Sequence, residues 1–110
     1  DMYNPKALRA SMGSLLRIPI IAVDDLVGTL ERANSDGMLT AATVPDENAR
    51  DITKTDFTAG VIAVIGNEGN GVTEAVKSTA RERITIKMKG EAESLNASVA
   101  AVITMWEIMR

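Results

Sequence analysis

The sequence predicts an α/β domain with a mostly parallel sheet and flanking helices. Apolar stretches of strand length alternate along the chain with stretches of helical periodicity, which is the order of elements in such domains. One strand-length stretch, 60–65 (GVIAVI), is an unbroken apolar run, as expected of a parallel strand covered on both faces. The 110 residues are enough for one domain and too few for two, so residues 1–110 are expected to form a single unit.

The N-terminal quarter is expected to contain a short helix and a strand. Asn4 is a suitable N-cap and Pro5 suits the first helical position, which predicts a helix over 4–10. After a break, the apolar stretch 15–23 is a strand candidate, although Pro19 would suit only an edge strand or a strand end.

A helix and a second strand should follow. Asp24 or Asp25 caps a helix that runs to about Asn34, and its apolar residues share one face. That face comprises Leu26, Val27, Leu30 and Ala33. Residues 38–43 form the next strand, and 44–57 is expected to be polar loop with at most one helical turn.

The second half repeats the alternation of strand and helix. The strand 60–65 leads through the glycine-rich segment 66–71 into a helix with Thr73 as its cap. Residues 84–88 alternate like a strand and place Ile84, Ile86 and Met88 on one face. A final helix is expected over 94–110.

The final helix is apolar around most of its circumference. Its few polar positions, which are expected to lie on the surface, are Asn96, Ser98, Thr104 and Glu107. Such a helix must be covered on more than one side, so its own sheet cannot be the only cover. A subunit interface or a further segment of protein is expected to cover the other side of the helix.

Composition excludes several classes of site. No cysteine or histidine is present, so disulfides, thiolate metal sites and the usual zinc sites are ruled out, and no metal is expected. No apolar run is long enough to span a bilayer. The N-terminus lacks a signal-peptide pattern, which makes the cytoplasm the default, and its abrupt start at Asp1 suits an excised domain.

Charge is unevenly distributed although the net value is only −3. Segment 24–56 holds eight acids and three bases, whereas five of the basic residues fall close together between 77 and 89. These are Lys77, Arg81, Arg83, Lys87 and Lys89. Charge alone favours a solvated surface, and the functional alternative is an edge that faces phosphates.

The loop GNEGNG at 66–71 is the first candidate site. Its glycines would let a ligand approach the backbone, but an ordinary tight strand-to-helix turn explains them equally well. The spacing fits neither a dinucleotide fingerprint nor a P-loop. Glu68 inside the loop would repel a phosphate and favour a cation such as a sulfonium or an arginine.

The entry to the final helix is the second candidate. On general grounds Ser94 is the N-cap, which leaves Asn96 as either surplus polar surface or a site residue. Because each of the two loops follows a parallel strand, both should lie at the same edge of the sheet.

Three blocks of sequence carry a family resemblance: NPKALRASMGSLLRIPI at 4–20, VIGNEGNGV at 64–72 and ITIKMKGEAESLNASVAAVI at 84–103. In this order they resemble the SpoU (TrmH-like) family of RNA 2′-O-ribose methyltransferases. The resemblance implies the C-terminal, cofactor-binding part of the methyltransferase domain, with a trefoil knot (the SPOUT fold) and the N-terminal part of the domain missing. It also implies S-adenosylmethionine as cofactor, rRNA or tRNA as substrate, and a homodimer through the C-terminal helix.

The resemblance also assigns roles to individual residues. Backbone groups of Gly66, Ile86 and Leu95 match the positions that hold the cofactor. The remaining residues assigned to the cofactor pocket are Ala42, Thr43, Asn67, Gly69 and Met88. The conserved polar positions beside the reacting atoms are matched by Glu68, Ser94 and Asn96.

Two departures from the family pattern stand out. Lys87 replaces the proline that usually lies between Ile86 and Met88, which should lower rigidity more than cofactor binding. The family's first motif, with its principal catalytic arginine, would lie upstream of this chain, and neither Arg9 nor Arg17 matches it. We therefore expect this chain alone to be inactive. The alternatives are a non-catalytic fragment that dimerises and binds cofactor, and, more remotely, a flavodoxin-like nucleotide-binding protein.

Overall fold

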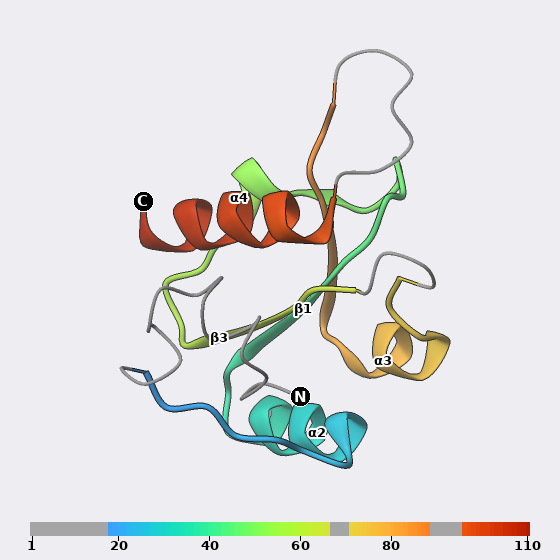
Figure 1. The fold of residues 1–110 in the computed structure, drawn as a ribbon, viewed down its shortest axis with the longest axis vertical. Coiled ribbons are helices and arrows are strands. Elements are labelled where there is room, and N and C mark those ends of the chain that lie inside the picture. The colour runs from blue at the N-terminus through green and yellow to red at the C-terminus, as the bar shows by residue number, and fades with distance from the viewer. Residues whose placement is uncertain (1–17, 67–70, 89–95) are drawn as a thin grey trace, which may run out of the picture.

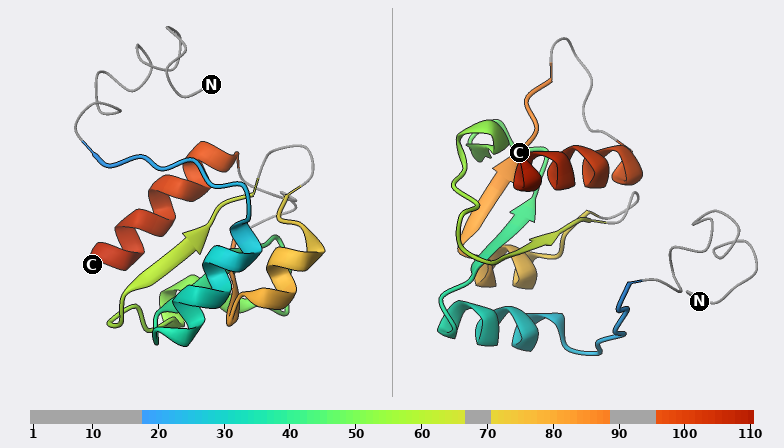
Figure 2. Two further views of the ribbon diagram at one scale, coloured as in Figure 1. Left: turned by 90° about the horizontal axis from the view of Figure 1, so that it is seen from below. Right: turned by 90° about the vertical axis from the view of Figure 1, so that its left-hand side faces the viewer.

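A four-stranded parallel sheet forms the centre of the molecule, with helices on both faces (Figures 1 and 2). The computed structural model describes residues 18–66, 71–88 and 96–110. The strands are β1 (Leu39–Thr43), β2 (Arg50–Asp51), β3 (Val61–Val64) and β4 (Glu82–Thr85). The helices are α2 (Leu26–Ser35), the 3-10 turn η2 (Ile52–Lys54), α3 (Glu74–Thr79) and α4 (Ala97–Met109).

The described strands lie in the order β2-β4-β1-β3, and every pair is parallel. Helices α2 and α3 pack together on one face, and α4 lies on the other (Figure 2). This arrangement confirms the predicted α/β architecture. The apolar strand β3 is parallel as predicted, but it lies at an edge of the described sheet and its four residues are only half-buried.

Two of the expected helices begin where their caps predicted. The Asp25 carboxylate accepts a hydrogen bond from the Gly28 backbone N–H at 2.9 Å and starts α2. The Thr73 hydroxyl accepts one from the Val76 N–H at 3.3 Å and starts α3. The predicted apolar face of α2 points into the core, where Leu30 is fully buried.

The predicted strand over 15–23 is wrong for the part that the structure describes. Residues 18–23 have no strand pairing, and the side chains of Ile18 and Ile21 are 60% and 81% exposed. Pro19 lacks the backbone N–H that a ladder needs. The predicted helix over 4–10 lies outside the described residues.

Two further boundaries differ from the sequence prediction. The expected polar loop 44–57 contains strand β2 as well as the helical turn η2. Strand β4 ends at Thr85 instead of residue 88, because its neighbours end there: Thr43 pairs with Ile84, and Asp51 pairs with Thr85. Beyond these pairs the described sheet offers β4 no ladder partner.

The core has two halves, one on each face of the sheet. Between the sheet and helices α2 and α3 lies a cluster of Leu30, Ala42, Val72 and Val76. On the other face lies a cluster of Ala41, Ile52 and Ile84, against which Phe57 and Ile86 pack. Neighbouring residues of one strand thus serve opposite faces, as the two-residue period of a strand requires.

A buried threonine joins three elements beneath the sheet. The Thr40 hydroxyl, which is fully buried, donates to Asn34 Oδ1 at 2.6 Å and accepts from the Arg81 backbone N–H at 2.9 Å. The Asn34 amide donates in turn to the Thr79 carbonyl oxygen at 2.9 Å. These bonds hold the C-terminal part of α2 against β1 and the segment that enters β4.

Helix α4 starts later than predicted and is only half covered. Its N-cap is Asn96, not the expected Ser94, which lies outside the described residues. Thr104, which the sequence placed on the surface, is buried, and its hydroxyl is satisfied by the Ala100 carbonyl of its own helix at 2.7 Å. The outward side is apolar: Val99, Val102, Met105, Trp106 and Met109 are all exposed.

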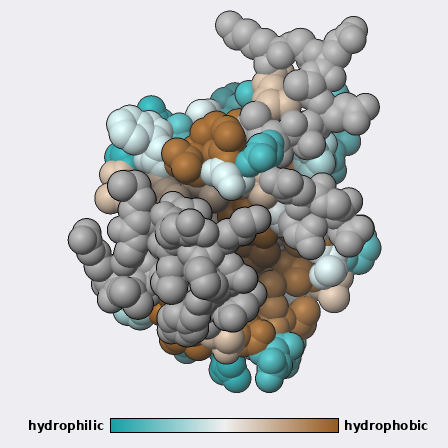
Figure 3. Space-filling view, viewed as in Figure 1, coloured by the Kyte–Doolittle hydropathy of each residue, from teal (hydrophilic) through white to brown (hydrophobic). Residues whose placement is uncertain are grey.

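We call these five outward residues the α4 stripe. Trp106 and Met109 are 68% and 85% exposed, unusual values for such large apolar side chains. The space-filling view shows hydrophobic surface among hydrophilic areas on the face it presents (Figure 3). The exposure of these five side chains agrees with the prediction that the sheet covers only one side of α4.

Candidate functional site

The described cofactor candidates gather at the carboxyl edge of the parallel sheet. Thr43 ends β1, Gly66 follows β3, and Ile86 follows β4. The register brings these ends together, because β1 pairs with β3 on one side and with β4 on the other (Figure 1). Ligands of open parallel sheets bind at this edge. The described ends of β1, β3 and β4 thus lie at one edge, and the convergence of the 66–71 loop with the entry to the final helix stays a prediction.

Gly66 is required by a close approach within the chain. A Cβ at this position would lie 2.7 Å from the Gly71 carbonyl carbon and 2.8 Å from the Val72 nitrogen. Gly71 has a φ of 65°, in the left-handed region that favours glycine. The two glycines thus close the base of the 66–71 loop, which brings backbone groups together at the end of β3.

Ala42 and Thr43 differ in what they can offer a ligand. The Ala42 side chain is fully buried in the cluster beneath α2, so only its backbone can take part in a site. The Thr43 hydroxyl is half-buried and donates to the Val64 carbonyl oxygen at 2.9 Å. This bond ties the end of β1 to the end of β3.

Ile86 and Met88 form an apolar border on the other side of β1. Both are half-buried, and Ile86 packs against the cluster around Ile84. Because β4 has already ended, the backbone groups of residues 86–88 are not used in its ladder. An apolar border whose backbone groups lie outside the described ladder suits a flat heterocycle that needs both contact area and a few hydrogen bonds.

Asn96 has a structural role that the sequence did not assign to it. Its Oδ1 accepts hydrogen bonds from the N–H groups of Ser98 at 2.8 Å and Val99 at 3.4 Å, which caps α4. Its amide group remains able to donate. Any catalytic role of Asn96 must therefore be separated from capping by experiment.

Five of the predicted site residues lie outside the described part of the chain. They are Asn67, Glu68, Gly69, Ser94 and Leu95. Their roles stay predictions.

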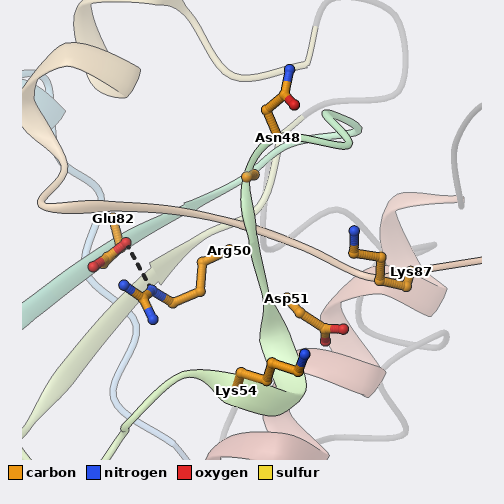
Figure 4. A pocket seen from close by; sticks show the side chains of 7 residues that line it. Asn48, Arg50, Asp51, Lys54, Glu82 and Lys87 are labelled. Carbon is orange, nitrogen blue, oxygen red and sulfur yellow. Dashed lines mark hydrogen bonds and ion pairs between the residues drawn. The ribbon is translucent and has the colours of Figure 1, made fainter.

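The structure also has a polar cleft that sequence reasoning did not assemble. It runs along the outer strand β2 and the parallel strand β4, and we call it the β2 cleft (Figure 4). Its lining comprises Asn48, Ala49, Arg50, Asp51, Lys54, Glu82 and Lys87. Arg50 and Lys54 come from the segment that the sequence marked as acidic, so only the fold brings them to Lys87.

The basic run 77–89 does not form one continuous edge. Lys77 lies on α3, where it pairs with Glu74 at 3.3 Å, and Arg81 donates to the Asn34 carbonyl oxygen at the end of α2. Lys87 lines the β2 cleft instead. These three basic residues therefore lie at different places in the fold, and the alternative of one edge that faces phosphates does not hold for them.

The acidic side chains of the β2 cleft are already engaged. Asp51 Oδ1 accepts from the Thr53 hydroxyl at 2.7 Å and from its N–H at 2.9 Å. These bonds, and the nearby charges of Lys54 and Lys87, hold the pKa of Asp51 below its ordinary 3.8. Glu82 pairs with Arg50 at 3.3 Å.

Within the described ranges, no group of three or more acidic residues is placed to hold a metal ion. No helix in this part of the chain is long and apolar enough to cross a membrane.

Comparison with known proteins agrees with the geometry. The profile of the SpoU rRNA methylase family matches residues 1–106. A Staphylococcus saprophyticus protein named as a TrmH family tRNA/rRNA methyltransferase is 37% identical over 102 residues, covering 93% of this chain and 41% of that protein. The 23S rRNA (uridine(2479)-2′-O)-methyltransferase of Streptomyces viridochromogenes is 32% identical, covering 100% of this chain and 40% of the relative.

Solved structures give the same result. The crystal structure of the SpoU methyltransferase AviRb from Streptomyces viridochromogenes, in complex with AdoMet, matches with a TM-score of 0.85 and 30% identity. The match covers 98% of this chain and 44% of that one. The chain thus spans about two fifths of the length of the curated relatives reported above. The family profile over residues 1–106, the relatives and the shared fold together show that this chain belongs to the SpoU rRNA methylase family.

Proposed function

We propose that this chain is the cofactor-binding part of a longer enzyme that transfers a methyl group from S-adenosylmethionine to a ribose 2′-OH of rRNA or tRNA. The observation that carries the proposal is the family match over residues 1–106, joined to the convergence of Thr43, Gly66 and Ile86 at one edge of the sheet. AviRb, a relative of the same fold, was solved with AdoMet.

The residues at the edge fit such a cofactor. Ile86 and Met88 supply apolar surface for an adenine ring, and the backbone between them lies outside the β4 ladder, where it can offer hydrogen bonds to the cofactor. The bound cofactor supplies the sulfonium methyl group, which is an electrophile without further activation. The protein's task is then to align the ribose hydroxyl and to accept its proton.

Glu68, Ser94 and Asn96 are our candidates for the polar side of the site. The Glu68 carboxylate would favour the cationic cofactor or orient an arginine, because opposite charges attract strongly at a desolvated site. The principal catalytic arginine is expected upstream, so residues 1–110 alone should not turn over. We also propose that the C-terminal part of the chain forms the trefoil knot that the family resemblance implies.

The α4 stripe supports a homodimer as part of this function. Several large apolar side chains are exposed on one side of α4, and burying each of them fully would contribute roughly 1.5–3 kcal/mol. Exposed apolar patches of this kind mark association surfaces. A second copy of the chain is our proposed partner for this surface.

Methyl transfer by the full-length protein tests the proposal. Purified protein, radiolabelled S-adenosylmethionine and unmodified rRNA and tRNA should yield a 2′-O-methylated nucleotide, identified by mass spectrometry of the digested RNA. Methylation of a base, or no transfer to any RNA, would defeat it. Residues 1–110 alone serve as the inactive comparison.

Two variants of Asn96 separate catalysis from capping. Asn96→Ser keeps a good N-cap, whereas Asn96→Ala removes it and should cost about 1 kcal/mol of stability. If the amide acts in the reaction, both variants lower the rate, but only the alanine variant lowers the unfolding midpoint. A serine variant with the wild-type rate would restrict Asn96 to its structural role. Glu68→Ala should lower the rate with the fold intact.

A further inference from the structure

The β2 cleft combines three cations with two acids, one of which is ion-paired and the other hydrogen-bonded. Arg50, Lys54 and Lys87 line it together with Asp51 and Glu82, so its net charge is +1 in a chain whose net charge is −3. The net charge understates how strongly the cleft would attract an anion, because Glu82 is bound to Arg50 and Asp51 accepts two hydrogen bonds from Thr53.

Of the three cations that line the cleft, Lys54 and Lys87 are the two without an ion pair among the described residues. Among the described residues neither Lys54 nor Lys87 forms an ion pair within 4.0 Å; Lys87 makes only a long contact of 3.4 Å with the Glu47 carbonyl oxygen. Figure 4 shows their ammonium groups on the side of the cleft away from the Arg50–Glu82 pair. Two ammonium groups in one concave surface, neither within 4.0 Å of a described carboxylate, make a site for anions.

The position of the cleft connects it with the candidate cofactor site. Lys87 lies in the chain between Ile86 and Met88, and the cleft extends from there back along β4 to Glu82. The five residue steps from Glu82 to Lys87 span at most about 16 Å. That length exceeds the spacing of successive phosphates along a nucleic acid strand, so more than one phosphate can lie in it.

We propose that the β2 cleft binds backbone phosphates of the substrate RNA beside the reacting nucleotide, with Lys54 and Lys87 as the principal contacts. This inference rests on the proposed function, since it assumes an RNA substrate. Ammonium groups on flexible stems recognise phosphates without reading the sequence, so the cleft positions the strand and does not select the base.

Salt-dependent RNA binding by the full-length protein tests the inference. The probe is a fluorescently labelled RNA hairpin of arbitrary sequence, measured by anisotropy between about 50 and 200 mM salt. Lys54→Gln with Lys87→Gln should reduce the slope of log affinity against log salt by about 1 to 2. Each lost contact should weaken binding about five- to eightfold at 0.1 M salt.

The matched control removes two cations elsewhere. Arg32→Gln with Lys77→Gln changes net charge equally, but these residues lie on α2 and α3 and do not line the β2 cleft. The control should bind RNA with the wild-type slope. Lys54→Arg with Lys87→Arg keeps both charges and should also retain binding.

The outcomes separate this inference from the proposed function. A wild-type protein that binds no RNA would overturn both. If the wild type binds RNA and the two glutamine pairs lose the same amount, the effect is one of overall charge and the cleft is not a phosphate site. Wild-type binding by the Lys54→Gln, Lys87→Gln protein would overturn the inference and leave the proposed function standing.

Discussion

Replacing Gly66 by alanine tests whether the loop after β3 depends on a close backbone approach. The added Cβ would lie 2.7 Å from the Gly71 carbonyl carbon, 2.8 Å from its Cα and 2.8 Å from the Val72 nitrogen. Carbon atoms pack at about 3.5–4.0 Å, so the two backbone segments would have to separate by about 0.8 Å. All three neighbours are backbone atoms, so no side chain can turn aside to relieve the clash.

The expected cost follows from overpacking in well-packed regions, which is about 1–3 kcal/mol. If the strain falls on the loop, it appears as an affinity for S-adenosylhomocysteine that is about 5- to 150-fold weaker, because each 1.4 kcal/mol is tenfold. Calorimetry on the full-length protein measures this affinity. Urea unfolding then shows whether the strain has spread into the domain.

Gly60→Ala is the matched control. Its Cβ would lie 3.4 Å from Cε of Met38, the end of a flexible side chain, so the fold can accept it. The control should bind cofactor like the wild type. A Gly66→Ala protein with unchanged affinity and unchanged unfolding midpoint would refute the argument, since the loop would then not depend on this contact.

Three further predictions concern stability, acid response and assembly. Thr40→Val keeps the shape of the side chain but removes two hydrogen bonds that join separate elements, and should lower the free energy of unfolding in urea by about 2 kcal/mol. Thr104→Val changes an equally buried residue but breaks only a bond within its own helix, so it should cost less than half as much. Equal costs would contradict this account. NMR should show that the pKa of the Asp51 carboxyl lies below 3.8 in the folded protein, and Thr53→Val should raise that pKa. Because the folded pKa is depressed, the charged carboxylate stabilises the fold above pH 3.8, and this stabilisation is lost as the pH falls through the folded pKa. A titration midpoint of Asp51 unmoved by Thr53→Val would contradict the assigned cause. Trp106→Ala should raise the dissociation constant of the homodimer that we propose for the full-length protein at least tenfold in sedimentation, because a twofold interface loses the side chain twice. A dimer unaffected by this change would place the interface elsewhere.

Local signals in the sequence were enough for the elements whose ends are set by capping or by periodicity. Asp25 and Thr73 mark the starts of α2 and α3, because each side chain accepts a hydrogen bond from an N–H of the first turn. The apolar run 60–65 predicted a parallel strand, and the strand-to-helix loops placed the candidate site at the carboxyl edge. The three sequence blocks were sufficient to identify the family, which the profile over residues 1–106 shows.

Elements without such signals were decided by their neighbours. Strand β2 is two residues long and exists because β4 offers it a ladder, and β4 ends where its neighbours end. The apolar stretch 18–23 looks like a strand but has no pairing in the structure. Strand formation depends on hydrogen bonds to partners distant in sequence, which local composition does not reveal.

The sequence by itself determined the family, the α/β class and the loops that carry the candidate cofactor site. Tertiary structure decided which charged groups lie together. Lys77 pairs with Glu74 on α3 and Arg81 bonds to the end of α2, whereas Arg50, Lys54 and Lys87 line the β2 cleft. It also made Asn96 a helix cap and buried Thr104 while exposing Trp106. The reason is physical, since caps and periodicity act over a few residues, whereas a cleft or a covered face depends on how separate elements pack.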